Sequence, residues 1–131
     1  NMSMVYNDLG DPAEGLRLCR QGLAIFEQIG DEPRQAIARY ELGNNALYLG
    51  RWDEAREQLD GAVALAQRLG LDARLLNSYW CLGLLELFRG DAAACERYFQ
   101  LSLERALSPS SGDKRLAADV LWHLGFLAMV R

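Results

Sequence analysis

Hydrophobic and polar residues follow one another along most of the chain with the spacing of amphipathic helices. In the stretch "EAREQLDGAVALAQRLG", apolar side chains recur at i, i+4, i+7 and i+8 and so share one helix face: they are Ala55, Leu59, Ala62, Val63 and Ala66. No segment alternates with the two-residue period of a half-buried strand. The pattern therefore predicts an all-α chain.

Local signals mark where these helices begin and end. Asp11, Pro12 and Glu14 supply an N-cap, a first-turn proline and a capping-box partner. Similar entry positions are predicted at Asp31, Asp72, Asp91 and Asp113. Helix ends are predicted at Gly10, Gly30, Gly50, Gly70 and Gly90. The expected helices are one ending at residue 9, followed by 12–29, 33–49, 52–69, 73–89, 92–107 and 114–131.

These signals recur with a period of 40 residues, as the glycines at 10, 50 and 90 illustrate. The pair Leu42-Gly43 returns 40 residues later at positions 82 and 83, and 42 residues after that at 124 and 125. The two extra residues fall in "SPSSGD" (108–113), which has a loop composition. Such a period predicts a single domain of stacked repeats. Its units are a partial repeat 1–30, repeats 31–70 and 71–110, and a partial repeat 111–131.

The small and large residues within each unit resemble a tetratricopeptide repeat. The first complete copy has Leu42, Gly43, Ala46, Gly50, Trp52, Ala55, Leu59 and Ala62, and the second has Leu82, Gly83, Gly90, Cys95, Phe99 and Ser102. The resemblance implies an α-solenoid of antiparallel helical hairpins wound into a right-handed superhelix. The period exceeds the usual ~34 residues and the proline that often closes each repeat is absent. Extended repeats of this length are similar to those in some large bacterial regulators and in kinesin light chains.

The first helix of each hairpin carries a second apolar stripe. Its members are Tyr40, Asn44, Leu47 and Tyr48, then Trp80, Leu84, Leu87 and Phe88, then Trp122, Phe126, Met129 and Val130. The resemblance implies that these positions, with Asn77, line a concave groove that binds a protein or peptide segment. The alternative is that they seal contacts between helices in the core. Asn44 and Asn77 lack the lysines or arginines of a cluster that grips a peptide carboxylate, which disfavours that specialised mode.

Composition disfavours several classes of partner. The net charge is −4, Lys114 is the sole lysine and no run of basic residues occurs, so no direct nucleic-acid partner is expected. The longest apolar run, residues 120–130, is too short to span a bilayer, and no signal-peptide pattern is present. We therefore expect a cytoplasmic location and no membrane partner.

Candidate chemistry is sparse. Cys19, Cys81 and Cys95 are odd in number and far apart, so we expect reduced thiols in the core and no metal site. His123 has no second base nearby in the sequence, which favours a packed or surface role. Without a convergent base, nucleophile or metal, no catalytic residue and no cofactor are expected.

One acidic stretch is interpreted as solvated surface. Asp53, Glu54 and Glu57 are expected to share an exposed helix face with Arg56 and to pair weakly with it.

The sequence thus predicts a non-catalytic protein–protein interaction or scaffolding module. One alternative is the sensor segment of a bacterial transcriptional or signalling regulator, to which the repeat length and the composition rich in Arg, Ala and Leu are similar. Another is self-association, because helix 114–131 is apolar on nearly every face. A missing repeat of a longer array or a symmetric dimer would cover it. The expected dimer interface consists of Leu121, Trp122, Phe126 and Met129.

Overall fold

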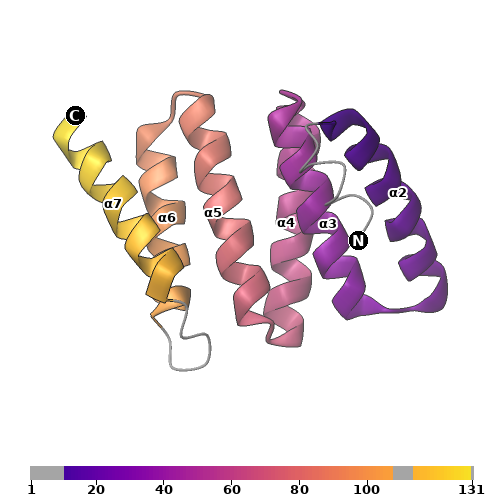
Figure 1. Cartoon of the computed structure of the whole chain (residues 1–131). Helices are drawn as coiled ribbons and strands as arrows, with labels where there is room; N and C mark the ends of the chain where they lie inside the picture. Colours follow the sequence, from indigo (N-terminus) through magenta and orange to yellow (C-terminus); the bar gives the residue numbers. More distant parts are fainter. Residues whose placement is uncertain (1–10, 108–113, 131) are drawn as a thin grey trace.

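The computed structural model describes residues 11–107 and 114–130, and within these ranges the chain is helical with no strand (Figure 1). The helices are α2 (Pro12–Ile29), α3 (Glu32–Tyr48), α4 (Trp52–Leu69), α5 (Asp72–Phe88), α6 (Ala92–Ala106) and α7 (Lys114–Val130). The predicted bounds agree with these to within a residue at each end. The helix predicted to end at residue 9, its terminal Gly10 and the cap at Asp113 lie outside the described residues.

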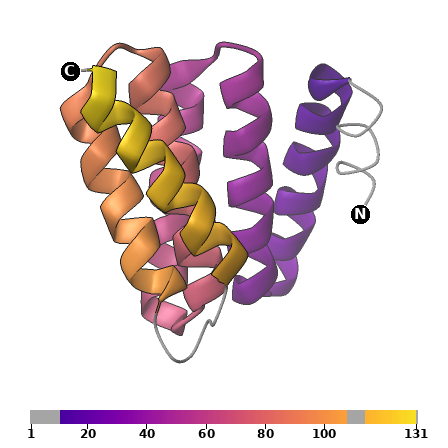
Figure 2. The same cartoon turned by 60° about the vertical axis from the view of Figure 1, so that its left-hand side comes forward.

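The helices pack in chain order, each against the next. The hairpins α3–α4 and α5–α6 have the most extensive contacts, α2 packs on α3, and α7 packs on α6 (Figures 1 and 2). The first helices α3 and α5 also contact each other directly. This arrangement confirms the predicted solenoid of helical hairpins, in which each unit buries its faces against its neighbours.

Three of the predicted aspartate caps are confirmed and one is wrong. Asp11, Asp31 and Asp91 each accept a hydrogen bond from the backbone N–H three residues later. Asp72 is instead the first residue of α5, whose N-cap is Leu71 without a side-chain hydrogen bond. The side chain of Asp72 points to a neighbouring helix, where it pairs with Arg105 at 3.6 Å.

Glycine allows the two helices of each hairpin to approach closely. A Cβ atom on Gly43 would lie 2.6 Å from Cγ of Leu59, and one on Gly83 would lie 2.4 Å from the ring of Phe99. Both distances are far below a van der Waals contact, so any side chain at these positions would separate the helices. The glycine of the Leu-Gly pair therefore recurs in the repeat because a larger residue would prevent this close packing of the two helices.

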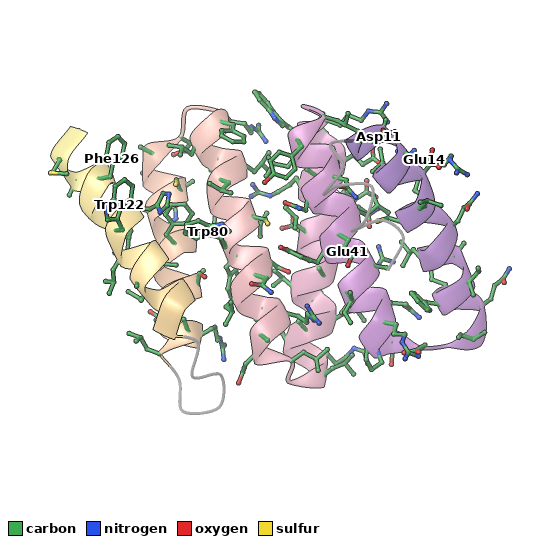
Figure 3. The ribbon with its side chains drawn as sticks, in the orientation of Figure 1. Asp11, Glu14, Glu41, Trp80, Trp122 and Phe126 are labelled. Carbon is green, nitrogen blue, oxygen red and sulfur yellow. The ribbon has the colours of Figure 1, made fainter. Side chains whose placement is uncertain are left out.

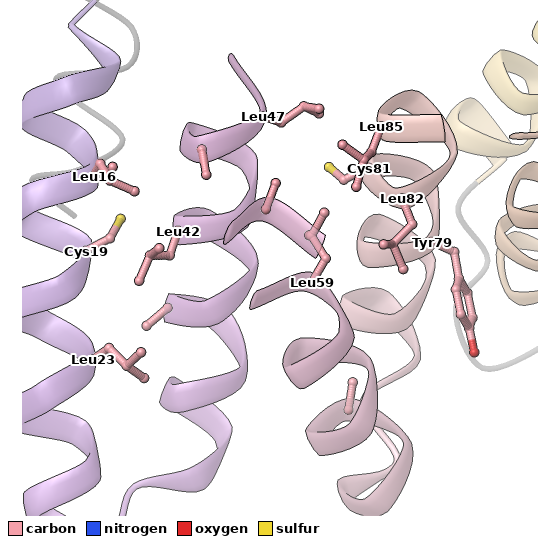
Figure 4. Close-up of a cluster of buried hydrophobic side chains, with 14 of the residues drawn as sticks. Leu16, Cys19, Leu23, Leu42, Leu47, Leu59, Tyr79, Cys81, Leu82 and Leu85 are labelled. Atoms are coloured by element: carbon pink, nitrogen blue, oxygen red, sulfur yellow. The ribbon is translucent and has the colours of Figure 1, made fainter. Parts of the chain in front are cut away.

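The core runs through the stack between successive helices. Figure 4 shows Leu16, Cys19 and Leu23 of α2 near Leu42 of α3, with further leucines continuing the cluster to α5. The side chains of Cys19, Cys81 and Cys95 are buried, as expected for cysteines that belong to the core. Among the described helices, none combines the length and apolarity needed to cross a membrane.

Candidate interaction surface on the first helices

The predicted groove residues come from α3, α5 and α7, the first helices of successive units. Figure 3 labels Trp80 on α5 with Trp122 and Phe126 on α7. Their exposure is uneven. Tyr48, Leu87, Phe88, Trp122, Phe126 and Met129 are exposed, whereas Tyr40, Asn44, Asn77, Trp80 and Leu84 are half-buried.

Part of the stripe joins α3 to α5. Leu47 is 2% exposed and belongs to the core, so it cannot present a surface to a partner. Burial, together with the nearby Cys81, raises the pKa of Tyr40. The Cys81 thiol also donates to Oδ1 of Asn44 at 3.6 Å. At this level of α3, the stripe residues pack between α3 and α5. This agrees with the alternative interpretation, in which they belong to the core.

A second part of the stripe belongs to an aromatic cluster. Trp80 stacks on Phe99 of α6, with centroids 4.5 Å apart and planes inclined by 16°. His123 of α7 meets the Trp80 ring edge-on at 4.9 Å. Such offset and edge-on contacts stabilise beyond the area they bury. Trp80 therefore connects α5, α6 and α7, and His123 is packed in this cluster.

The open part of the stripe lies at the C-terminal ends of α3 and α5. Tyr48 is 66% exposed and Phe88, which is 40 residues later in the repeat, is 51% exposed. The half-buried amides of Asn44 and Asn77 lie on the same two helices. Exposed aromatics and half-buried amides on the same helices can bind an apolar peptide and hydrogen-bond its backbone.

Helix α7 exposes an unusually large apolar surface. Trp122 is 67% exposed and Met129 is 79% exposed. The rings of Trp122 and Phe126 are nearly parallel, with centroids 6.0 Å apart. Because burying a large apolar side chain is worth about 1.5–3 kcal/mol, this helix gains stability from any partner that covers it.

An ionic network between α4, α5 and α6 corrects the interpretation of Arg56 as a surface residue. The Arg56 guanidinium pairs with the buried carboxylate of Glu86 and donates to the hydroxyl of Tyr98 at 3.0 Å. It also lies over the Tyr98 ring at 5.6 Å and pairs with Asp60 at 3.4 Å. The sequence feature that could have indicated this network is Glu86, an acidic residue flanked by leucines in an otherwise apolar helix. Asp53 and Glu57 are exposed, as expected, whereas Glu54 is half-buried and pairs with Arg20 of α2 at 2.5 Å.

A pocket of about 510 Å³ opens between α2 and α3. Its walls are mainly apolar and include Ile25 and Phe26 of α2 and Ile37 of α3. Its polar lining residues are Cys19, Gln21, Arg34 and Glu41, and the Cys19 thiol donates to the Glu41 carboxylate at 3.8 Å. The sequence pattern does not indicate this pocket, because its lining residues come from two different helices.

The described residues offer little for catalysis. Within them, no three histidine, cysteine or acidic side chains are grouped as metal ligands. Burial raises the pKa of Cys81 to about 12 and, with the carboxylates of Glu86 and Glu96, raises the pKa of Cys95 to about 11. These two thiols therefore stay protonated near neutral pH, in the form that is a poor nucleophile.

Comparison with known proteins agrees with this architecture. A scan against protein-family models matches residues 1–70 to the tetratricopeptide repeat. A search of the curated proteins found no match. Tetratricopeptide repeats generally mediate protein–protein interaction or scaffolding and are typically non-catalytic.

Proposed function

The chain belongs to the tetratricopeptide repeat family, and we propose that it binds an apolar segment of a partner protein along α3 and α5. The observation that carries this proposal is the pair Tyr48 and Phe88. These rings occupy the same position in successive repeats, and both remain exposed although the rest of their helices is largely packed. Exposed aromatics repeated on adjacent helices are typical of a protein interaction surface.

Two half-buried amides on the same helices as these rings favour an extended or helical peptide over a purely apolar ligand. Asn44 and Asn77 retain partial exposure. Because Oδ1 of Asn44 accepts from the Cys81 thiol, its NH2 group is the part left to donate to a peptide backbone, whereas the amide of Asn77 has both donor and acceptor groups. Trp80 and Leu84 form a half-buried floor. A rigid floor reduces the conformational entropy lost on binding. Trp122 and Phe126 extend the surface onto α7.

A displayed library of random peptides tests the proposal. We expect selection against the chain to enrich peptides with aromatic or branched aliphatic residues. The double variant Tyr48→Ser, Phe88→Ser should weaken the selected peptides at least tenfold in fluorescence titration. Leu101→Ser, which changes an exposed leucine on α6, is the matched control and should bind normally. Peptides that bind the double variant as tightly as the parent chain would place the surface elsewhere.

Within the same proposal, the module serves a cytoplasmic bacterial transcriptional or signalling regulator. The 40-residue period and a composition with one lysine among 14 basic residues favour this context. A peptide selected from the library should then resemble a segment of a regulator or of its inhibitor. A synthetic peptide with the sequence of that natural segment should compete with the selected peptide for the chain.

A further inference from the structure

Arg74, near the start of α5, lacks the ion pair that the repeat provides at its position. One repeat earlier, Arg34 pairs at 3.1 Å with Asp31, the residue that caps α3. In the second repeat, Leu71 stands at the position of that aspartate. Arg74 is half-buried, yet it forms no ion pair with any of the described residues. Its guanidinium is therefore partly removed from water without a compensating charge.

Two further polar residues on the next turn of α5 replace apolar residues of the repeat. Asn77 corresponds to Ile37 of α3, and its half-buried side-chain amide makes no hydrogen bond within the described chain. Ser78 corresponds to Ala38, and its hydroxyl is buried without a hydrogen-bond partner among the described residues. Buried polar groups are nearly always hydrogen-bonded, so such a hydroxyl needs an explanation. Helix packing does not supply one, because the preceding repeat has apolar residues at both positions.

The three polar side chains are neighbours at one end of the apolar stripe. Residues three and four apart on a helix lie side by side, so Asn77 and Ser78 both adjoin Arg74. The first turns of a helix also carry the positive end of its dipole. Trp80 follows Asn77 by three residues and continues the stripe toward Phe88. The surface on α5 therefore has an aromatic end and an end with unused hydrogen-bond donors and a positive charge.

We propose that Arg74 and Asn77 bind an acidic side chain of the partner, so that the preferred partner segment is apolar with one aspartate or glutamate. The inference rests on the proposed function, because it concerns the same surface. The guanidinium can donate to a carboxylate in two parallel hydrogen bonds, and the amide NH2 group adds a neutral donor. One arginine balances the single charge of a carboxylate but not the charge of about −2 of a phosphate group.

The length of α5 sets where the acid should lie in the partner. Arg74 and Phe88 are 14 positions apart, which is about 21 Å along the helix axis. An extended peptide advances about 3.3 Å per residue, so it covers this distance in about six residues. An extended partner that runs along α5 should therefore carry its acid about six residues from the side chain that contacts Phe88. A helical partner would need about 14 residues.

A comparison of two chains with two peptides tests the pairing. The probe is the tightest acid-containing peptide from the library described above, made with both ends blocked so that its carboxylate belongs to a side chain. Its derivative has that Asp or Glu changed to Asn or Gln. In fluorescence titration, Arg74→Gln and the amide derivative should each weaken binding about tenfold, and both together should weaken it little further.

Two other arginine variants sharpen this comparison. Arg74→Lys keeps the charge without the paired donors and should recover part of the lost affinity. Arg97→Gln changes an exposed arginine on α6 and is the matched control, which should bind both peptides as the parent chain does. Thermal unfolding of Arg74→Gln should match that of the parent chain, because the substitution breaks no ion pair within the described residues.

The acidic preference and the apolar surface fail in different ways. Suppose that the selected peptides lose affinity for Tyr48→Ser, Phe88→Ser but contain no excess of acids, or bind Arg74→Gln as tightly as the parent chain. The acidic partner is then overturned and the apolar surface stands. Peptides whose binding the double variant leaves unchanged would overturn both. An Arg74→Gln chain that unfolds at lower temperature and loses both peptides equally would assign Arg74 to the fold and overturn its role in recognition.

Discussion

Gly83 on α5 and Gly125 on α7 occupy the same position of the repeat, and their surroundings differ. The interior glycine lies against Phe99 of the following helix, whereas the glycine on α7 faces open space. The same difference applies to the aromatic stripe, which is partly sealed at Trp80 and exposed at Trp122. A repeat motif therefore specifies which face needs a neighbour, and the position in the stack decides whether the described chain provides one.

Adding a methyl group to each glycine should give the largest contrast. Gly83→Ala places a Cβ atom 2.4 Å from the ring of the buried Phe99, so we expect the free energy of unfolding to fall by about 3 kcal/mol. Gly125→Ala meets no clash and should raise helix propensity, stabilising the chain by up to about 1 kcal/mol. Urea denaturation followed by circular dichroism measures both. Equal losses would mean that α7 is as closely packed as α5.

The ionic network of the interior should give the next largest effect. Arg56→Met leaves the Glu86 carboxylate buried without its guanidinium partner, which should cost about 2 kcal/mol. The double variant Arg56→Met, Glu86→Leu removes both charges and should recover most of that loss. Ala46, at the position of Glu86 in the preceding repeat, indicates that the fold accepts an apolar residue there. Additive losses in denaturation would contradict the expected coupling.

Alkaline pH should destabilise the interior through its buried thiols. The pKa of Cys81 rises from 9.0 to about 12 in the folded chain because burial disfavours the thiolate. Above about pH 9 the unfolded chain loses this proton and the folded chain keeps it. Stability is therefore complete below pH 9 and should fall as pH rises toward about 12, by about 1 kcal/mol per pH unit. Cys81→Ala should flatten this slope in thermal unfolding at pH 8, 9 and 10, and an unchanged slope would assign it to other groups.

The helix caps should give the smallest effect. The Asp91 carboxylate accepts from the backbone N–H of Ala94 at 3.0 Å, so Asp91→Ala should cost about 1 kcal/mol. Asp72 makes no such cap and pairs with the partly exposed Arg105, so Asp72→Ala should change stability by less than about 0.5 kcal/mol. Thermal unfolding of the two variants compares them. If Asp72→Ala lost more stability than Asp91→Ala, the original prediction that Asp72 caps α5 would be correct.

The sequence by itself determined the elements of this protein. Helix bounds, the caps at Asp11, Asp31 and Asp91 and the 40-residue register were all predicted from residues close together in the chain. These features depend on backbone hydrogen bonds and side chains within about one helical turn, which a local pattern specifies. The family resemblance and the solenoid of hairpins followed from the same register.

Only the tertiary structure decided which residues of the apolar stripe are available to a partner. Leu47 and Tyr48 are adjacent in the sequence, yet the first is buried and the second is exposed. Arg56 has the sequence context of a surface residue and becomes the centre of a network with Glu86 and Tyr98. Burial depends on side chains brought together from different helices, and a helical period gives the direction of a face but not the neighbour that covers it.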